Sequence, residues 1–179
     1  MMETAAPRRS PIYELPPPNP NAHRAGLIEW TGLGVVAVVA VIADQVTKSI
    51  ATRSLALNEP VDVVPFFDLT RIHNTGIAFG QFTGQQSLVM VLTVVAVVWM
   101  IVFFARSGSR HVLFPVALGL LVGGALSNLV DRVRAGFVTD FLHIHHWPIF
   151  NLADTFIVIG VALLLLGLTA HERRTRARQ

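Results

Sequence analysis

Two aspartates in the C-terminal half, Asp140 and Asp154, are the residues best suited to chemistry. They stand fourteen positions apart in VTDFLHIHHWPIFNLAD, and Asp154 opens an uncharged run from Thr155 to Ala170. A carboxylate at the edge of such an apolar run is costly in a membrane and indicates a functional site. Two adjacent carboxylates cannot both ionise comfortably, so one can take a proton from water while the other, protonated, polarises a carbonyl. The pair therefore predicts aspartic peptide hydrolysis.

The same aspartates allow a structural interpretation, in which both lie at the membrane interface as helix caps. Asp154 at a helix N-terminus would be favoured by the helix dipole. Asn151 precedes it by three positions, and it either holds a catalytic carboxylate by a hydrogen bond or caps the helix. A third interpretation is a transporter or ion-binding protein in which buried carboxylates relay protons. The spacing alone leaves these alternatives open.

Asp44 and Lys48, the only lysine in the chain, form a second candidate group. They stand four positions apart on an apolar run, which favours an intrahelical ion pair with Lys48 extending outward to the interface. The functional alternative makes Lys48 the base for a serine nucleophile such as Ser127. We expect the structural role.

Three histidines between the aspartates, His143, His145 and His146, raise the question of a metal site. The sequence has no HExxH motif, and alternating histidines in a short loop do not supply tetrahedral geometry by themselves. We therefore expect a solvated interfacial loop, and an activity that needs no metal and no cofactor.

The composition points to a membrane protein. The 179 residues are 53% hydrophobic and only 14% charged, with a mean hydropathy of +0.57. The absence of cysteine excludes disulfides, thiolate metal sites and a cysteine nucleophile. Most of the thirteen arginines stand at the ends of apolar runs, as membrane orientation requires, so the pI of about 10.5 does not indicate nucleic acid binding.

The elements that must position these residues are four apolar segments. Each approaches the roughly 20 residues that cross a bilayer as helix. They are Leu27–Ile50, Ser87–Phe104, Val112–Val130 and Asn151–Ala170. We expect one membrane domain over residues 26–171, preceded by a disordered, proline-rich cytoplasmic tail (1–25) and followed by a basic cytoplasmic tail (172–179).

The distribution of Lys and Arg predicts the orientation in the membrane. Nine of these residues fall on the side of the two termini and five on the other side, so the positive-inside rule places both termini in the cytoplasm. The connections 51–86 and 131–150 then lie outside, and the candidate acids lie at or near that same outer face. The first outer connection is rich in aromatic and β-branched residues, among them Val61, Val63, Phe66 and Ile72. This composition favours short strands with a turn at Asn74–Gly76 over a plain solvated loop.

The third apolar segment carries a face of small residues that includes one GxxxG, Gly119–Gly123. Small residues at this spacing are typical of close helix packing in membranes. Asn128, Asp131 and Arg132 follow at i, i+3 and i+4, so they share one helical face. Close packing would bring these polar groups near the neighbouring helices.

Five short motifs together resemble the lipoprotein signal peptidase, or signal peptidase II, family. They occur in the family's order between about Ala43 and Thr155. They are DQVTK (Asp44–Lys48), HNTGIAFG (His73–Gly80), GGALSNLVDR (Gly123–Arg132), VTDF (Val138–Phe141) and FNLAD (Phe150–Asp154). Each motif is weak alone, but five in order on a four-helix membrane protein are highly specific.

The resemblance implies a bacterial aspartic endopeptidase of the cytoplasmic membrane, with four transmembrane helices and a small extracytoplasmic β-cradle. Members of the family remove the signal peptide from diacylglyceryl-modified prolipoproteins, cutting on the N-terminal side of the lipidated cysteine. By resemblance, Asp140 and Asp154 form the catalytic dyad at the extracytoplasmic face. The matching motifs assign substrate contacts or orientation of the site to Asn74, Gly76, Arg132, Asn128 and Asn151, and structural support to Asp44, Lys48 and Asp131. The expected partners are the lipidated substrate and membrane lipid, with the enzyme acting as a monomer.

Three features depart from the family's pattern. Ile77 stands where a small residue is usual, Ser127 replaces a common glycine as a mild change in packing, and the loop between the aspartates is short. Asp131 is a rival partner for Asp154, but its neighbour Arg132 suggests that it is neutralised structurally.

Overall fold

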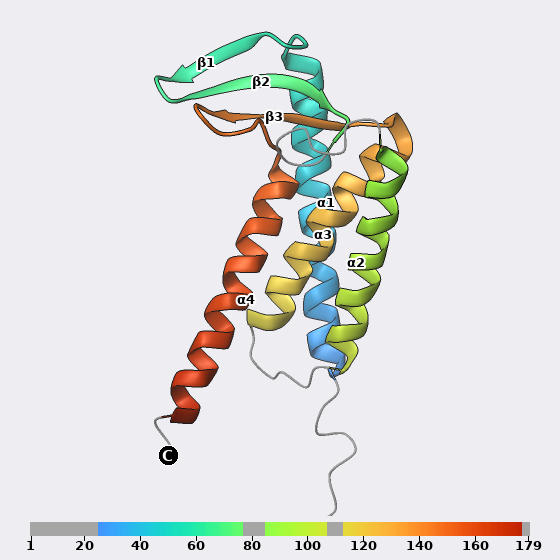
Figure 1. Ribbon diagram of the computed structural model, residues 1–179, viewed down its shortest axis with the longest axis vertical. Coiled ribbons are helices and arrows are strands. Elements are labelled where there is room, and N and C mark those ends of the chain that lie inside the picture. Colours follow the sequence, from blue (N-terminus) through green and yellow to red (C-terminus); the bar gives the residue numbers. More distant parts are fainter. Residues whose placement is uncertain (1–24, 77–84, 107–112, 177–179) are drawn as a thin grey trace, which may run out of the picture.

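The computed structural model describes residues 25–76, 85–106 and 113–176, which form four helices and three strands (Figure 1). In chain order these are α1 (Leu27–Ser54), β1 (Pro60–Val64), β2 (Phe67–Asn74), α2 (Gln86–Arg106), α3 (Leu113–Ala135), β3 (Val138–Ile144) and α4 (Leu152–Arg176). The expected tail over residues 1–25 lies outside the described residues except for Ala25, as does Ile77. Helix α4 continues through Arg176, into the segment expected to form the second tail.

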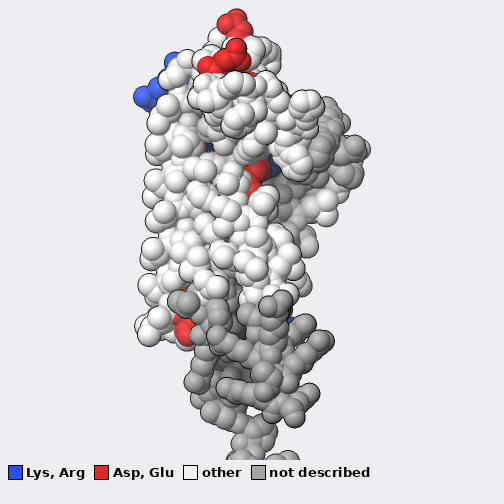
Figure 2. Space-filling view, turned by 90° about the vertical axis from the view of Figure 1, so that its left-hand side faces the viewer, with Lys and Arg blue, Asp and Glu red and all other residues white. Residues whose placement is uncertain are grey.

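Three of the helices, α1, α2 and α3, are long and apolar enough to cross a membrane. The fourth, α4, is a helix of 25 residues, but its apolar part, Leu152–Gly167, is shorter. The described chain is thus mostly helical with at least three candidate membrane spans. The face of the bundle seen in Figure 2 is almost free of charged side chains over its middle, as lipid contact requires.

Helix α3 lies at the centre of the bundle, packed against α1, α4 and α2. Glycines allow the close approach: a Cβ at Gly123 would lie 2.6 Å from the Ala37 carbonyl oxygen of α1. A Cβ at Gly124 would lie 2.5 Å from the Ala153 carbonyl oxygen of α4. Close packing through the small-residue face of this segment is therefore confirmed.

The strands form one antiparallel sheet in the order β1-β2-β3, at one end of the bundle (Figure 1). Strands β1 and β2 confirm the expectation for the first outer connection, and the Gly76 amide donates to Asn74 Oδ1 at 2.9 Å in the expected turn. The Arg71 guanidinium donates to the carbonyl of Thr52 at the end of α1, which ties the sheet to the bundle. The first and last described residues lie at the opposite end, away from the sheet.

Strand β3 is a feature that the sequence analysis missed, since it treated the whole segment between the aspartates as a loop. Residues Val138–Ile144 pair with β2, and Phe150 turns back to form a bridge with Leu142. Asp140 therefore lies on a strand and Asp154 on a helix. The sheet and the bundle meet between them.

Candidate active site

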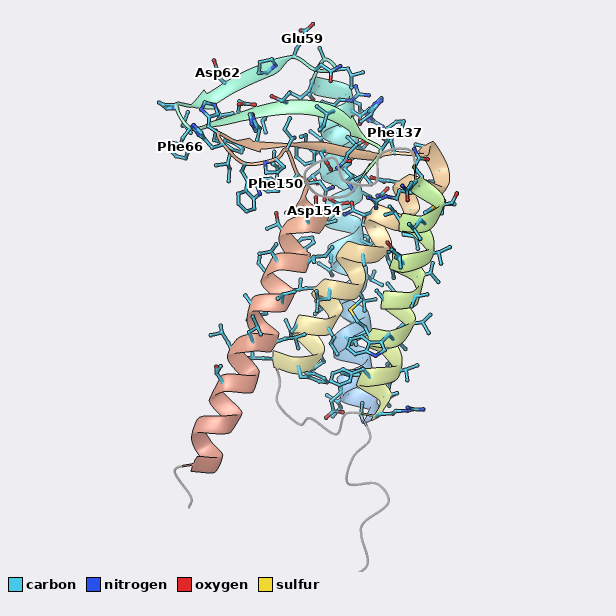
Figure 3. All side chains as sticks on the ribbon, viewed as in Figure 1. Glu59, Asp62, Phe66, Phe137, Phe150 and Asp154 are labelled. Carbon is cyan, nitrogen blue, oxygen red and sulfur yellow. The ribbon has the colours of Figure 1, made fainter. Side chains whose placement is uncertain are left out.

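Asn151 joins the two predicted catalytic aspartates. Its side-chain Nδ2 donates to Asp140 Oδ1 at 2.6 Å, and its Oδ1 accepts from the backbone amide of Asp154 at 3.0 Å. The residue is fully buried, between Phe150, which forms a bridge with Leu142, and the first turn of α4. These two bonds bring Asp140 and Asp154 to the same junction. Figure 3 shows Asp154 there, at the start of α4 beneath the sheet.

Asp140 is a buried acid surrounded by neutral donors. Its side chain is 1% exposed, and it accepts from Asn151 at Oδ1 and from the Asn74 amide at Oδ2, the latter at 2.8 Å. Burial, and then the charge of Asp154, raise the pKa of Asp140 to about 6 from an ordinary 3.8, while the two amides act in the opposite direction. This carboxyl can therefore carry a proton near neutral pH.

Asp154 forms a capping box at the start of α4. Its Oδ2 accepts from the backbone amide of Asn151 at 3.2 Å, while Asn151 Oδ1 accepts from the amide of Asp154, so each residue satisfies the other. The remaining oxygen, Oδ1, accepts from Asn128 Nδ2 at 2.8 Å. Asn151 thus caps α4 and also holds a candidate catalytic carboxylate by a hydrogen bond. Both roles that the sequence analysis offered as alternatives for Asn151 are present together.

Asn128 is oriented by its own neighbours. Its Oδ1 accepts from Lys48 Nζ at 2.8 Å and from Asn151 Nδ2 at 3.1 Å. With the oxygen fixed by two donors, the amide nitrogen must face Asp154. Asn128 therefore links the aspartate pair to the charged residues of α1.

Lys48 pairs with two carboxylates inside the bundle. Its Nζ lies 2.7 Å from Asp44 Oδ2 and 2.8 Å from Asp131 Oδ2, and its side chain is 5% exposed. The expected intrahelical ion pair is confirmed, but the expectation that Lys48 extends outward is wrong, because Asp131 and Asn128 on α3 hold it inward. The expectation that Arg132 neutralises Asp131 is also wrong, since Lys48 does so. Lys48 is occupied by these partners, and the Ser127 hydroxyl donates to Asp44 and not to Lys48, so this geometry disfavours a Ser/Lys peptidase.

Ser127 and Gln45 complete this ionic group. The buried Ser127 hydroxyl donates to Asp44 Oδ2 at 2.7 Å, and Gln45 Nε2 donates to Ser127 Oγ and to Asp131 Oδ1. Ser127 is therefore more than the mild packing change expected. The sequence analysis missed Gln45, although its position in DQVTK, three before Lys48, places the two side chains on one helical face.

Asp44 also reaches the start of α4. Its Oδ1 accepts from the backbone amide of Ala153 at 2.9 Å. This amide belongs to the first turn, whose donors have no partner within the helix. Asp44 therefore anchors the turn that carries Asp154.

Arg132 reaches the turn after β2. Its Nη2 donates to the Gly76 carbonyl at 3.0 Å, and Gly76 follows Asn74, the donor to Asp140. Asn74, Gly76 and Arg132 thus lie together beside the aspartates. An acidic side chain is visible in a hollow under the sheet in the space-filling view (Figure 2).

The histidines lie apart from the aspartate pair, on the sheet. His143 Nδ1 and His145 Nε2 lie 2.9 and 3.2 Å from Asp68 Oδ2. His146 adopts a positive φ of 70° in the turn that follows. Over residues 25–76, 85–106 and 113–176, no group of three or more His, Asp or Glu side chains is arranged to hold a metal ion.

Comparisons with known proteins give the family. A family model described as signal peptidase (SPase) II matches residues 36–170. The chain belongs to the signal peptidase II family. A lipoprotein signal peptidase of Symbiobacterium thermophilum is 40% identical over 148 residues, covering 80% of this chain and 97% of the relative. One of Syntrophotalea carbinolica is 43% identical over 149 residues, covering 79% and 92%.

Solved structures agree with the signal peptidase II assignment at the level of fold. A bacterial membrane enzyme determined by the in meso method at 2.3 Å superposes with a TM-score of 0.75 at 33% identity, covering 83% of this chain and 92% of that one. A second, at 1.9 Å, gives 0.71 at 34% identity, covering 82% and 96%. Membership of the signal peptidase II family makes this chain a bacterial membrane protease and implies removal of signal peptides from prolipoproteins.

Proposed function

We propose that Asp140 and Asp154 form the catalytic dyad of an aspartic endopeptidase. Its substrates are diacylglyceryl-modified prolipoproteins, cut on the N-terminal side of the lipidated cysteine. The observation that carries this proposal is the shared partner Asn151, which bonds to Asp140 through its amide nitrogen and to the Asp154 backbone through its oxygen. Two acids on different elements, with one buried residue between them, suit a shared proton and a shared water.

In the proposed reaction the ionised carboxylate takes a proton from water, and the resulting hydroxide attacks the scissile carbonyl carbon. The protonated carboxyl gives its proton to the carbonyl oxygen. The tetrahedral intermediate then breaks its C–N bond, with a proton passing to the leaving nitrogen. The raised pKa of Asp140, about 6, suits the role of proton donor to the carbonyl oxygen.

The polar residues around the dyad position the substrate. We assign contacts with the extended substrate backbone to Asn74, Gly76 and Arg132, because these groups converge beside Asp140. Asn128 and Asn151 hold the two carboxylates by neutral amides, which leaves each free to change its protonation. Fixing the reacting groups in this way accounts for a large part of the rate that such a site can supply.

We further propose that α4 crosses the membrane as the fourth span. Both termini then lie in the cytoplasm and the dyad lies at the extracytoplasmic face, which fits the sheet at one end of the bundle and the described chain ends at the other. A diacylglyceryl-modified substrate would reach the site by diffusion in the bilayer, with membrane lipid around a monomeric enzyme.

The test is cleavage of a diacylglyceryl-modified prolipoprotein by purified Asp140→Asn and Asp154→Asn variants. Each should lose at least about 10²- to 10⁴-fold in kcat, because the amide cannot transfer the required proton. Asp62→Asn, at an exposed aspartate on β1, is the matched control and should retain full activity. EDTA should leave the rate unchanged. Substantial cleavage by a well-folded variant of either dyad residue would remove that residue from the dyad.

A further inference from the structure

A second cluster of titratable side chains lies on the sheet, outside the site described above. Asp68 is 3% exposed and its Oδ2 contacts both His143 Nδ1, at 2.9 Å, and His145 Nε2, at 3.2 Å. Its Oδ1 accepts from the Thr70 hydroxyl. The hydrogen bond from Thr70, followed by contacts with His143 and His145, lowers the pKa of Asp68 against the effect of burial. Asp68 is therefore ionised at neutral pH. Because an ionised carboxylate can only accept hydrogen bonds, the two nitrogens that contact it, His143 Nδ1 and His145 Nε2, must each carry a hydrogen.

This cluster lies directly beside an irregularity in the pairing of β2 with β3. Asp68 pairs with His143 and Leu69 with Leu142, but the register shifts before Ile72 pairs with Asp140. Two residues of β2 therefore oppose one residue of β3, which is a β-bulge. Thr70, a donor to Asp68, is one of the two bulged residues.

The bulge on β2 decides which β2 side chains lie on the same face of the sheet as Asp140. A regular ladder continued from the Asp68–His143 pair would place Arg71, not Ile72, opposite Asp140. A shift of one residue turns every following side chain to the other face of a strand. In a regular ladder Asn74 would face the opposite side of the sheet, and Asp140 Oδ2 would lose the Asn74 amide that holds it.

The cluster holds β3 in register on the far side of the bulge. His143 lies near the C-terminal end of β3, and His145 follows the strand directly. The backbone amide of His145 donates to the Phe66 carbonyl at 3.1 Å. A buried carboxylate is costly without donors, so Asp68 opposes any slip that separates it from the imidazoles. Strand β3 lies at the edge of the sheet, beside β2. The contacts around Asp68 therefore hold β3 in position on β2 at this end of the strand pair.

We propose that Asp68, together with His143 and His145, is a positioning cluster that sets the register of β3 and so places Asp140 for catalysis. This inference rests on the proposed function of Asp140. The cluster touches no reacting atom. Its role is to keep the bulge where it turns the Asn74 side chain toward Asp140.

The test begins with Asp68→Ala, assayed on the diacylglyceryl-modified prolipoprotein. A misplaced Asp140 should lower kcat by about 10- to 100-fold and leave KM within about twofold. Asp68→Asn keeps an acceptor oxygen and should recover most of this loss. Asp62→Ala, at the residue paired with Asp68 on β1, and His146→Asn are the matched controls and should retain wild-type rates.

Two further measurements separate positioning from general destabilisation. Hydrogen exchange of the β3 amides should rise in Asp68→Ala while the α1 and α3 amides stay protected. The pKa that controls kcat/KM should rise, because Asp140 would lose the Asn74 hydrogen bond that lowers its pKa. If Asp68→Ala does not fold, the His143→Ala and His145→Ala single and double variants carry the same test, with a coupled, non-additive loss expected.

The outcomes are distinguishable from a failure of the proposed function. If Asp140→Asn is inactive while Asp68→Ala has the wild-type kcat, pH profile and exchange, the positioning role is overturned. If Asp140→Asn remains active, the dyad proposal fails. Hydrogen exchange of β3 then decides the register role by itself: raised exchange supports it and unchanged exchange overturns it.

Discussion

Two groups of acids lie near the end of the bundle that carries the sheet, and they are held in opposite ways. Asp44 and Asp131 share the ammonium of Lys48, at 2.7 and 2.8 Å. Asp140 and Asp154 accept instead from neutral amides, namely those of Asn74, Asn128 and Asn151. Asn128 touches both groups, because its oxygen accepts from Lys48 and its nitrogen donates to Asp154.

The difference shows how aspartate can support structure in one group and serve proton transfer in a neighbouring group. A carboxylate paired with a buried cation is stabilised in one protonation state, so it supports structure. A carboxylate held by amides is fixed in position without losing its capacity to bind a proton. Proton-transfer chemistry needs the second arrangement, and the first provides a rigid support beside it.

The largest effect should follow removal of the cation. Lys48→Met would leave Asp44 and Asp131 buried without their shared partner, which should lower the free energy of unfolding by about 3–5 kcal/mol. Denaturant or thermal unfolding in detergent measures this loss. Arg53→Met, at an exposed cation in the last turn of α1, is the control and should change stability little. Equal stability of Lys48→Met and wild type would contradict the paired arrangement.

A smaller effect, on rate more than on stability, should follow loss of the amide that joins the groups. Asn128→Ala removes the donor to Asp154, and hydrogen bonds to charged groups contribute about 1.5–3 kcal/mol. We expect kcat to fall by about 10- to 150-fold. Thr47→Ala loses only a bond to the Asp44 carbonyl of its own helix and serves as the control. A wild-type kcat in Asn128→Ala would show that Asp154 does not depend on this contact.

The amide-held pair should also be sensitive to pH. Since the pKa of Asp140 is raised from 3.8 to about 6, folding takes up a proton between about pH 4 and 6. The free energy of unfolding should therefore fall as the pH rises through that window. The value of kcat/KM should also fall above about pH 6, by up to about tenfold per pH unit, as the required proton is lost. A flat profile from pH 5 to 8 would argue against Asp140 as the proton donor.

The smallest effect should come from Ser127→Ala. Asp44 keeps Lys48 and the Ala153 amide after the hydroxyl is lost, so stability should fall by only about 0.5–1.5 kcal/mol and cleavage should remain within about threefold. Unfolding and cleavage assays on the same preparation test both values. Complete loss of cleavage with normal stability would instead support the Ser/Lys alternative.

The helices were predictable because long apolar runs leave little choice of structure. Apolar length alone located α1, α2 and α3, and the small residues around Gly123 indicated close packing. The position of Asp140 was not predictable in this way, because VTDFLHI joins polar and aromatic residues without a clear strand boundary. Its pairing with β2 depends on a partner more than sixty positions away.

The partners of the charged residues were harder to predict than their presence. Neighbouring positions suggested Arg132 for Asp131, whereas the structure joins Asp131 to Lys48 across two helices. The direction of Lys48 depends on Asn128 and Asp131 lying opposite it, which no spacing within α1 encodes. Helical periodicity gives the face of a residue, but packing between helices decides its partner.

Gly123 and Gly124 give α3 two faces without side chains, one against Ala37 of α1 and the other against Ala153 of α4. These contacts fix how far the helix carrying Lys48 stands from the helix carrying Asp154, and no smaller residue exists to bring them closer. Any larger residue would force the helices apart, because even the methyl group of an alanine would lie within 2.6 Å of a carbonyl oxygen. A substitution at either glycine would therefore push α3 away from α1 or α4 by a discrete distance, and the spacing of these helices cannot change gradually.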